Sequence, residues 1–443
     1  MKIKLSLLVA LFISIATFSQ KKWTLKEAVD YALENNINIK QNKLNLDIAE
    51  TNVKDAKGNF LPRVNGNASG NLSAGSNFNP VTNNRTSSQT FFGGGIGLSA
   101  GVTLFNGYRN LNIYKQAKLG IESSKTDLET IKNDISLRVI NAYLNVLFSR
   151  ENLNASKIQA NISKKQIDAA KSRFEAGVIP KGDLLNAQST AANDIQNVIA
   201  NENALNLALL NLAQLLQVPS ENFNVADLNV DLPSAELFYS NSQIVYDKAL
   251  TTQPQIERAK LAIQNADLDI EISKSGYLPT ISTSIFANTN YNYILKPSGV
   301  PSGNFFDQLE GNLGYGLGLS VNVPIFNGFK NDANVERSKI NKEIFETRLE
   351  NEKLNLQQTI EQSFLDVKAA VKTYEAAKIS LESQKEAFKN AEERYNYGAM
   401  TLFDFDLVRT RLVNAEAAMI RAKYDYVFKT KVLQFYSGEL ILE

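Results

Sequence analysis

The stretch Val323-Pro324-Ile325-Phe326-Asn327-Gly328 decides how the chain is organised, because the sequence contains it twice. The earlier copy reads Val102-Thr103-Leu104-Phe105-Asn106-Gly107, and the two Asn-Gly pairs lie 221 residues apart. Each copy ends a run that alternates between apolar and small or polar residues, and each opens a long run with helical spacing. A change from a period of two to a period of about 3.6 marks a strand followed by a helix. We therefore predict strand–helix junctions at Phe105, Asn106, Gly107, Phe326, Asn327 and Gly328.

The same offset relates further motifs, among them an arginine followed by a glycine and an aspartate. These are Arg173, Gly177 and Asp183 in the first half, and Arg394, Gly398 and Asp404 in the second half. Self-similarity over half of a chain indicates a tandem duplication rather than a solenoid of short repeats. The sequence thus predicts two structural repeats, at 20–217 and 241–443, joined by a linker at 218–240.

Each repeat is expected to contain the same elements in the same order. A helix comes first, near 25–59 (broken near Asn36) or 242–276 (broken near Pro254), and a Leu-Pro pair ends it, since the residue before proline disfavours helix. Two strands with a polar loop between them, a long helix and a return helix follow. In the first repeat we place these at strands 63–74 and 93–105, long helix 107–175 and return helix 183–216. In the second they are strands 280–289 and 312–325, long helix 328–396 and return helix 403–436.

The predicted strands have the pattern of membrane-spanning β-strands. Leu317, Leu319 and Val321, for example, alternate with Gly318, Ser320 and Asn322. Runs of roughly ten residues with one apolar face and one small or polar face are typical of transmembrane barrels. A half-buried soluble sheet alternates too, but its wet face normally carries charges, which these strands almost lack.

A barrel of this kind needs several copies of the chain. Lipid does not tolerate open sheet edges, and single-chain barrels begin at about eight strands. The four predicted strands must therefore combine with those of other copies. Two copies would give eight strands and three would give twelve, and the wider barrel leaves room for a channel. The loops at 75–90 and 288–310 are expected outside the cell, because such barrels keep their longer loops there.

The long helices predict a second, helical compartment. At about 1.5 Å per residue, a helix from Gly107 to Phe174 would reach roughly 100 Å. Apolar residues follow heptad-like steps of three and four in the second long helix and in the first return helix, which predicts coiled-coil packing. They are Ile360, Phe364, Val367, Val371, Tyr374, Leu381, Phe388 and Tyr395, and then Ala191, Ile195, Val198, Leu205, Leu209, Leu212 and Leu216.

Composition excludes several classes of function. The 443 residues contain no His and no Cys, so disulfides, thiol chemistry, a lipid on cysteine and the usual zinc and haem sites are excluded. There are 47 Lys and Arg residues and 46 Asp and Glu residues, so the chain has almost no net charge that would attract nucleic acid. We expect no catalytic residues, no cofactor and no metal.

The N-terminus has the features of a cleaved signal peptide. Lys2 and Lys4 precede an apolar run from Leu5 to Phe18, and Ser19 is a suitable cleavage position. An anchoring helix is the alternative, but the run is shorter than the roughly 20 residues that span a bilayer. We predict that residues 1–19 are removed and that the mature chain is not lipidated.

In combination, these motifs resemble the TolC family of outer-membrane efflux and secretion channels. The resemblance rests on the duplication, Phe60-Leu61-Pro62 and Tyr277-Leu278-Pro279 before the strand pairs, the Phe-Asn-Gly junctions and the Arg-aromatic turns. It implies an α+β membrane protein and a homotrimer. Its twelve-stranded transmembrane β-barrel, with four strands per chain, would continue as a long α-helical barrel from the outer membrane into the periplasm. It also implies docking on a periplasmic adaptor (membrane fusion) protein coupled to an inner-membrane pump.

The resemblance places an iris-like gate at the turns beyond the long helices. Tyr395, Asp404 and Asp183 match the family's pattern, whereas Met400 stands where an arginine is expected and Leu407 replaces a second aspartate. The gate could therefore be held by charge or by apolar packing, and helix N-capping is an alternative role for Asp183 and Asp404. The candidate gate residues are Gly177, Lys181, Asp183, Tyr395, Gly398, Met400, Asp404 and Asp406.

The preferred function is a passive outer-membrane channel of a tripartite efflux pump or a type I secretion system. The alternative is a periplasmic coiled-coil adaptor or scaffold, which would also carry long helical hairpins but not the four barrel-type strands. An enzyme that uses carboxylates, such as a glycosidase, has no suitable pair of acids to support it. The sequence carries no signature of the exported substrate.

Overall fold

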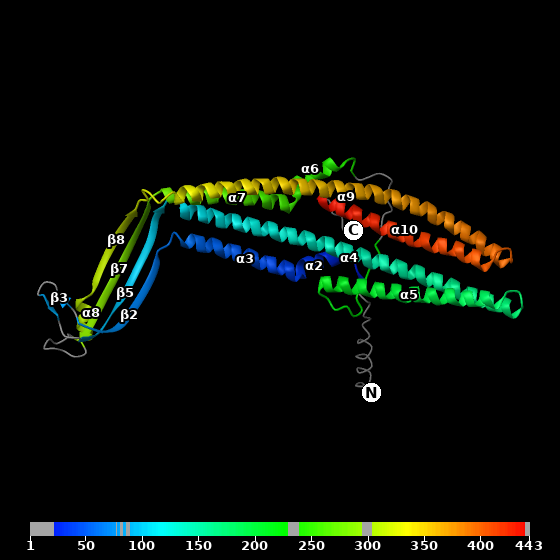
Figure 1. Cartoon of the computed structure of the whole chain (residues 1–443), viewed down its shortest axis with the longest axis horizontal. Helices are drawn as coiled ribbons and strands as arrows, with labels where there is room; N and C mark the ends of the chain where they lie inside the picture. The colour runs from blue at the N-terminus through cyan, green and yellow to red at the C-terminus, as the bar shows by residue number, and fades with distance from the viewer. Residues whose placement is uncertain are drawn as a thin grey trace, which may run out of the picture. The chain divides into compact units, whose positions relative to one another are not determined.

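The computed structural model describes residues 22–76, 78–79, 83–85, 89–228, 239–294 and 304–438 (Figure 1). The predicted signal peptide lies outside these ranges, as do 229–238 of the predicted linker and 295–303 of the second inter-strand loop. The chain forms two compact units: unit 1 comprises 1–44, 126–257 and 350–443, and unit 2 comprises 45–125 and 258–349. Within the described ranges, no helix combines the length and the apolar character that a membrane span requires.

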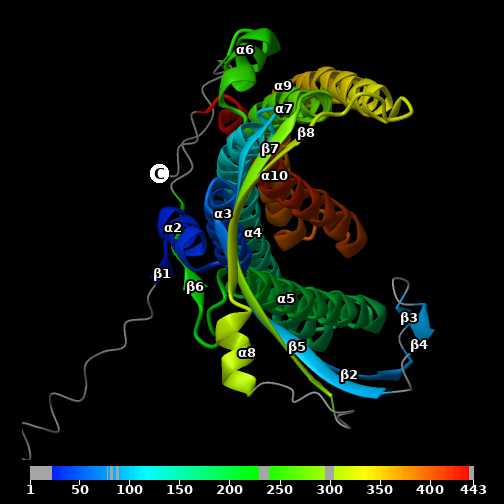
Figure 2. The same cartoon turned by 90° about the vertical axis from the view of Figure 1, so that its left-hand side faces the viewer.

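Unit 2 contains a four-stranded antiparallel sheet in the order β2-β5-β7-β8. Its strands are β2 (Arg63–Gly75), β5 (Gln89–Asn106), β7 (Thr280–Ile294) and β8 (Gly314–Asn322). The two halves of the sequence meet where β5 pairs with β7, and β2 and β8 form the edges. Figure 2 shows these strands as a curved, twisted band. A short hairpin follows β2, in which the two-residue strands β3 (Phe78–Asn79) and β4 (Asn84–Arg85) pair with each other.

One face of this sheet carries an apolar row that crosses all four strands. Val64 lies opposite Ala100, Ala100 opposite Ile285, and Ile285 opposite Leu317. Val64, Ile285 and Leu317 are 63%, 61% and 74% exposed. The next row continues this face with Leu98, Ala287 and Tyr315. Since residues two apart point to the same face of a strand, the alternation in the sequence produces a sheet with an uncovered apolar face.

The second inter-strand loop is shorter than the sequence predicts. The expectation of a loop at 288–310 is wrong at both ends, because β7 continues to Ile294 and α8 (Phe305–Gly311) is helical. Alternating Tyr291 and Tyr293 extend the strand pattern beyond the predicted end. Contacts then fix α8 to β7: the Thr289 hydroxyl donates to the Leu309 carbonyl at 2.6 Å, and the Asn292 N–H donates to the Gln308 side chain at 2.9 Å.

Both strand–helix junctions turn through two successive left-handed residues. Gly107 and Tyr108 have φ of 65° and 64°, and Gly328 and Phe329 have φ of 65° and 63°. The second strand, however, ends at Asn322 rather than at the predicted residue 325. Pro324 accounts for the difference, because proline has no N–H to donate to a neighbouring strand. The long helices α4 (Arg109–Glu175) and α9 (Lys330–Asn396) begin directly after the junctions.

Unit 1 contains the far parts of α4 and α9 together with their return helices, α5 (Lys181–Leu216) and α10 (Leu402–Tyr436). Figure 1 shows each long helix and its return helix as an antiparallel hairpin. Most of the predicted heptad positions on α9 are buried, with Ile360 completely inaccessible to solvent. On α5, Ile195 is 56% exposed in the single chain. The buried residues of that helix include Ala187, Ala191, Ala208, Leu212 and Leu216.

The shorter helices break where the sequence indicates. α2 (Leu25–Asn35) and α3 (Ile37–Gly58) meet at Asn36, whose side chain accepts from the Asn38 N–H at 2.9 Å. α6 (Ser242–Thr252) and α7 (Pro254–Lys274) meet at Gln253, directly before the proline. A proline at the first helical position is favourable, because the N–H that it lacks would have had no helical partner.

The predicted linker contains a strand that the sequence analysis missed. β6 (Asn224–Val225) pairs in parallel with β1 (Lys22–Trp23). Arg150 on α4 fixes this pair, since its guanidinium donates to the Asn224 side chain at 2.7 Å and to the Val225 carbonyl at 2.9 Å. The pair is too short for a recognisable alternation, so only the tertiary contacts reveal it.

Candidate gate at the helix turns

The turns between α4 and α5 and between α9 and α10 have the same backbone geometry. Gly177 and Gly398 have φ of 74° and 73°. The N–H of the following residue bonds back to a carbonyl five positions earlier: Val178 to Arg173 and Ala399 to Arg394, both at 2.8 Å. This is the Schellman ending of a helix, which places glycine at the left-handed position. The motif pairs identified in the sequence therefore correspond to equivalent turns.

One apolar cluster joins the two turns. Its buried members come from all four helices and include Ala170, Ala187, Ala391, Tyr395, Leu402 and Phe405. Ile179 from the first turn and Met400 from the second turn pack against it. Val178 and Phe403, by contrast, are 71% and 79% exposed. The apolar residues of the two turns thus divide into residues that hold the hairpins of one chain together and residues that are exposed in the single chain.

Tyr395 lies at the centre of this cluster. Its ring stacks on Phe405 with a centroid distance of 4.9 Å, and Cζ of the Arg173 guanidinium lies 4.8 Å from the centroid of the Tyr395 ring. Arg173 also donates to the carbonyls of Tyr395 and Asn396 at 3.2 and 2.8 Å. Burial raises the pKa of the Tyr395 hydroxyl, and the charge of Arg173 opposes this rise. An arginine from the other hairpin thus contacts the tyrosine, although Met400 replaces the arginine expected in the second turn.

Asp183 and Asp404 are not N-cap residues. The N-cap positions of α5 and α10 are Pro180 and Thr401, so both aspartates lie at the third helical position. The Thr401 hydroxyl accepts from the Asp404 N–H at 3.1 Å and lies 2.8 Å from its carboxylate. Acidic groups in the first turn of a helix are stabilised by the helix dipole. The hypothesis that Asp183 and Asp404 are N-caps is therefore wrong, and both lie in the first turn of their helices.

A buried charge cluster that the sequence analysis missed lies farther along the helices. Arg409 on α10 donates to the Asp194 carboxylate on α5 and to the Ser163 hydroxyl on α4, both at 2.7 Å. Ser163 in turn donates to Asp194. The side chains of Arg409 and Asp194 are only 8% and 13% exposed. This cluster connects three helices of one chain.

Asp406 also belongs to this cluster, but its hydrogen bonding is incomplete. Its Oδ1 lies 3.4 Å from Nε of Arg409, and neither of these buried atoms has a hydrogen-bond partner. Burial raises the pKa of Asp406, the charge of Arg409 opposes the rise, and the charge of Asp194 adds to it. One guanidinium therefore serves two carboxylates, which leaves an excess of negative charge among these helices.

The remaining candidate residues lie on the surface of the turns. Gly177, Lys181, Gly398 and Asp404 are exposed, and Asp183 and Met400 are partly buried. In the described part of the chain, no group of three or more acidic side chains is arranged to hold a metal ion. The geometry suits a mechanical role, in which two hairpins pack on a common cluster and present acidic and apolar groups at their ends.

Comparison with known proteins identifies the family. A family model described as "Outer membrane efflux protein" matches residues 28–217 and 245–439. The chain belongs to this family. The resemblance to the TolC family that the motifs indicate is thereby confirmed, and this outer membrane efflux protein shares its fold with known outer-membrane channels.

Individual relatives of this outer membrane efflux protein are distant in sequence. It is 23% identical over 276 residues to outer membrane protein TolC of Escherichia coli, a match that covers 60% of this chain and 54% of TolC. It is 23% identical over 419 residues to outer membrane efflux protein BepC of Brucella suis, which covers 94% and 86% of the two chains. The CmeC outer membrane channel of Campylobacter jejuni has a similar fold, with a TM-score of 0.77, 21% identity, and coverage of 95% and 86%.

Proposed function

We propose that this outer membrane efflux protein is a passive channel through which substrates leave the cell. The observation that carries the proposal is the apolar row across β2, β5, β7 and β8, which is exposed in the single chain. An uncovered apolar sheet face is unfavourable in water and favourable against lipid. A periplasmic adaptor or scaffold, the alternative, is not favoured, because it would have no use for such a sheet.

The proposed assembly is a homotrimer. β2 and β8 each pair on one side only among the described strands, and unpaired edges are not tolerated in lipid. Three copies would join β2 of one chain to β8 of the next and close a barrel of twelve strands. The α-helices would continue it as a helical barrel in the periplasm. The two matches to the family model support the proposed tandem repeats.

The proposed gate consists of the two helix turns of each chain. Energy would come from partners, namely a periplasmic adaptor protein and an inner-membrane pump, and the channel would need no cofactor. Export through a cleaved signal peptide at residues 1–19 and a mature chain without a lipid belong to the same proposal. The exported substrate is not specified by any residue pattern in the chain.

The oligomeric state tests this proposal. We expect native mass spectrometry in mild detergent to give three times the mass of the mature chain, and the trimer to form ion-conducting pores in planar bilayers. A matched variant, Leu317→Lys, places a charge on the exposed apolar row and should reduce insertion into lipid without affecting the helical unit. A dispersed, folded monomer that is soluble without detergent would contradict the proposal.

A further inference from the structure

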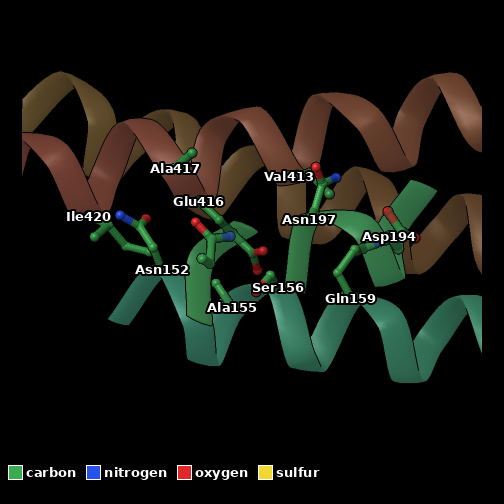
Figure 3. Close-up of a pocket in the computed structure, with 11 residues that line it drawn as sticks. Asn152, Ala155, Ser156, Gln159, Asp194, Asn197, Val413, Glu416, Ala417 and Ile420 are labelled. Carbon is green, nitrogen blue, oxygen red and sulfur yellow. The ribbon is translucent and has the colours of Figure 1, made fainter. Parts of the chain in front are cut away.

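A cavity with a mixed apolar and polar lining lies among α4, α5 and α10, within unit 1 and away from the turns (Figure 3). Its volume is about 220 Å³, which is space for several water molecules or a small organic ligand. Ile420, Val413, Ala417 and Ala155 form apolar parts of its wall. Polar side chains from all three helices provide the rest of the lining, so the cavity has both an apolar and a polar wall.

Two polar groups in the cavity need a partner. Gln159 is only 6% exposed, and its Nε2 has no hydrogen-bond partner. An unsatisfied buried donor of this kind costs about 1–3 kcal/mol, so it favours a ligand that offers an acceptor. Glu416 forms no ion pair with any described residue, whereas the neighbouring carboxylate of Asp194 is already paired with Arg409. The charge of Lys385 acts on Glu416 without forming an ion pair with it, so this half-buried carboxylate still favours a cation.

The side chains are directed toward a common space. In Figure 3 Glu416 points from α10 toward Ser156 on α4, and Gln159 lies on the same helix near Asp194. Ser156, toward which Glu416 points, and Gln159 differ by about 5 Å along the axis of α4 at roughly 1.5 Å per residue. A ligand that reaches both Glu416 and Gln159 needs a cationic group and an acceptor, and a chain of a few carbon atoms covers a separation of this order.

We propose that this cavity binds a small amino alcohol, that is, an alkylammonium ion that also carries a hydroxyl. The ammonium group pairs with the Glu416 carboxylate, and the hydroxyl oxygen accepts from Nε2 of Gln159. The alkyl chain lies against Val413 and Ala417. An anion is disfavoured because Glu416, Asp194 and Asp406 outnumber Arg409 in this region. The bound molecule would connect α4 and α10 of one chain.

Calorimetric titration of the full-length protein in detergent tests the proposal, with 4-amino-1-butanol as the probe. The buffer must not be Tris, which is itself an amino alcohol. We expect saturable binding of one molecule per chain and a higher melting temperature. n-Butylamine and 1-butanol, which each lack one of the two groups, should bind about tenfold more weakly or worse, since each loses a hydrogen bond to a buried or charged group.

Two variants identify the groups responsible. Glu416→Gln keeps the shape of the side chain and removes its charge, so affinity for the amino alcohol should fall about tenfold or more. Gln159→Leu should weaken binding of 4-amino-1-butanol but leave that of n-butylamine unchanged. Burial raises the pKa of Glu416, the charge of Lys385 on α9 opposes this rise, and Asp194 on α5 lines the same cavity. Binding should therefore weaken as acid protonates Glu416.

The proposal is overturned if 4-amino-1-butanol shows no saturable binding at millimolar concentration, or if Glu416→Gln binds it as the wild type does. Equal affinity for the amino alcohol and for n-butylamine would remove the role of Gln159. These outcomes are independent of channel activity, because conductance and trimer mass can remain normal while the cavity binds nothing.

Discussion

At the scale of single residues, Arg409 is a charged side chain buried among the helices of unit 1. Its guanidinium is almost completely buried and serves Asp194, Asp406 and the hydroxyl of Ser163. A buried charge is stable only where partners replace the water that it has lost. The contacts join three helices, so a change at this one side chain affects the packing of all of them.

Arg409→Met should lower the stability of the protein substantially. The substitution leaves Asp194 buried without its counter-ion, and breaking a buried pair in this way costs about 3–5 kcal/mol. Thermal denaturation in detergent should show a clear drop in melting temperature. Arg411→Met on the exposed side of the same helix is the control and should have little effect. A double variant with Asp194→Asn should recover part of the loss, and no recovery would argue against a charge-pair origin.

Asp406→Asn should stabilise the protein near neutral pH. Burial raises the pKa of Asp406 above its ordinary value of 3.8, so the folded state resists the ionised form. The resulting penalty is fully present above the raised pKa and disappears as the pH falls toward 3.8. The melting temperature of the variant should thus exceed that of the wild type at pH 7, and the difference should shrink in acid. A difference that is independent of pH would contradict this account.

Sequence reasoning identified some of these residues and missed others for a physical reason. Tyr395 was found because its neighbours repeat in both halves of the chain. Arg409, Asp194 and Ser163 form their cluster between helices, and no repeat or local spacing signals such a contact. The one local signal is that Arg409 lies on the apolar face of α10, between Phe405 and Leu412, where an isolated charge requires a buried partner.

At the scale of elements, the two strand–helix junctions have the same backbone geometry but differ in how closely other atoms pack against their glycines. A Cβ added to Gly107 would lie 2.8 Å from the Ser275 carbonyl oxygen and 2.9 Å from Cβ of Leu278. A Cβ added to Gly328 would meet nothing within 4 Å. The first junction packs against the 3-10 turn at Ser275–Tyr277, whereas the second is open in the single chain.

Gly107→Ala should therefore be more harmful than Gly328→Ala. Both substitutions place a side chain in the left-handed region, which costs about 1–2 kcal/mol. Only the first also forces atoms of the Ser275 turn to move. The measurement is the yield of folded oligomer and its denaturation midpoint in detergent, with each variant compared to the wild type. Equal losses at both positions would show that the second junction is packed as tightly in the assembly.

The helix turns should limit conductance if they form the gate. Tyr395→Ala removes the ring that stacks on Phe405, and Met400→Glu places a charge against the apolar cluster. Both changes should loosen the contact between the two hairpins and raise single-channel conductance in planar bilayers. Gln384→Ala, on α9 away from the turn, is the control and should conduct as the wild type does. If all three variants conduct alike, the constriction lies elsewhere in the channel.

The long elements could be predicted closely from the sequence, because their periodicity extends over many residues. The return helices begin at Lys181 and Leu402, within two residues of the predicted starts at 183 and 403. α8 and the β1–β6 pair were missed, since each is too short to show a period. Their positions depend on single contacts such as that of Thr289 with Leu309, which only the tertiary structure reveals.

At the scale of the whole molecule, the topology in the membrane can be tested from one loop. Asn83, between β3 and β4, is exposed and has a φ of 54°, which is typical of a tight turn. An epitope inserted after Asn83 should be labelled from outside on intact cells, because barrels place their longer loops outside. An insertion at Ala399, in the turn between α9 and α10, should be labelled only after the outer membrane is opened. The reverse pattern would invert the orientation. The matching position Ser302 lies outside the described residues.

The charge cluster around Arg409 also shows how far the two proposed repeats differ in sequence. At the offset of 221, Ser163 corresponds to Gln384, Asp194 to Ala415, and Arg409 to Gln188. The second half thus has no carboxylate where the first has Asp194, and the first has no guanidinium where the second has Arg409. The halves are no longer interchangeable: a chain built from two copies of either repeat would carry only one partner of the pair. The proposed duplication would have given the ancestor two equivalent hairpins, whereas in this chain each hairpin supplies a different partner of the ion pair between Asp194 and Arg409.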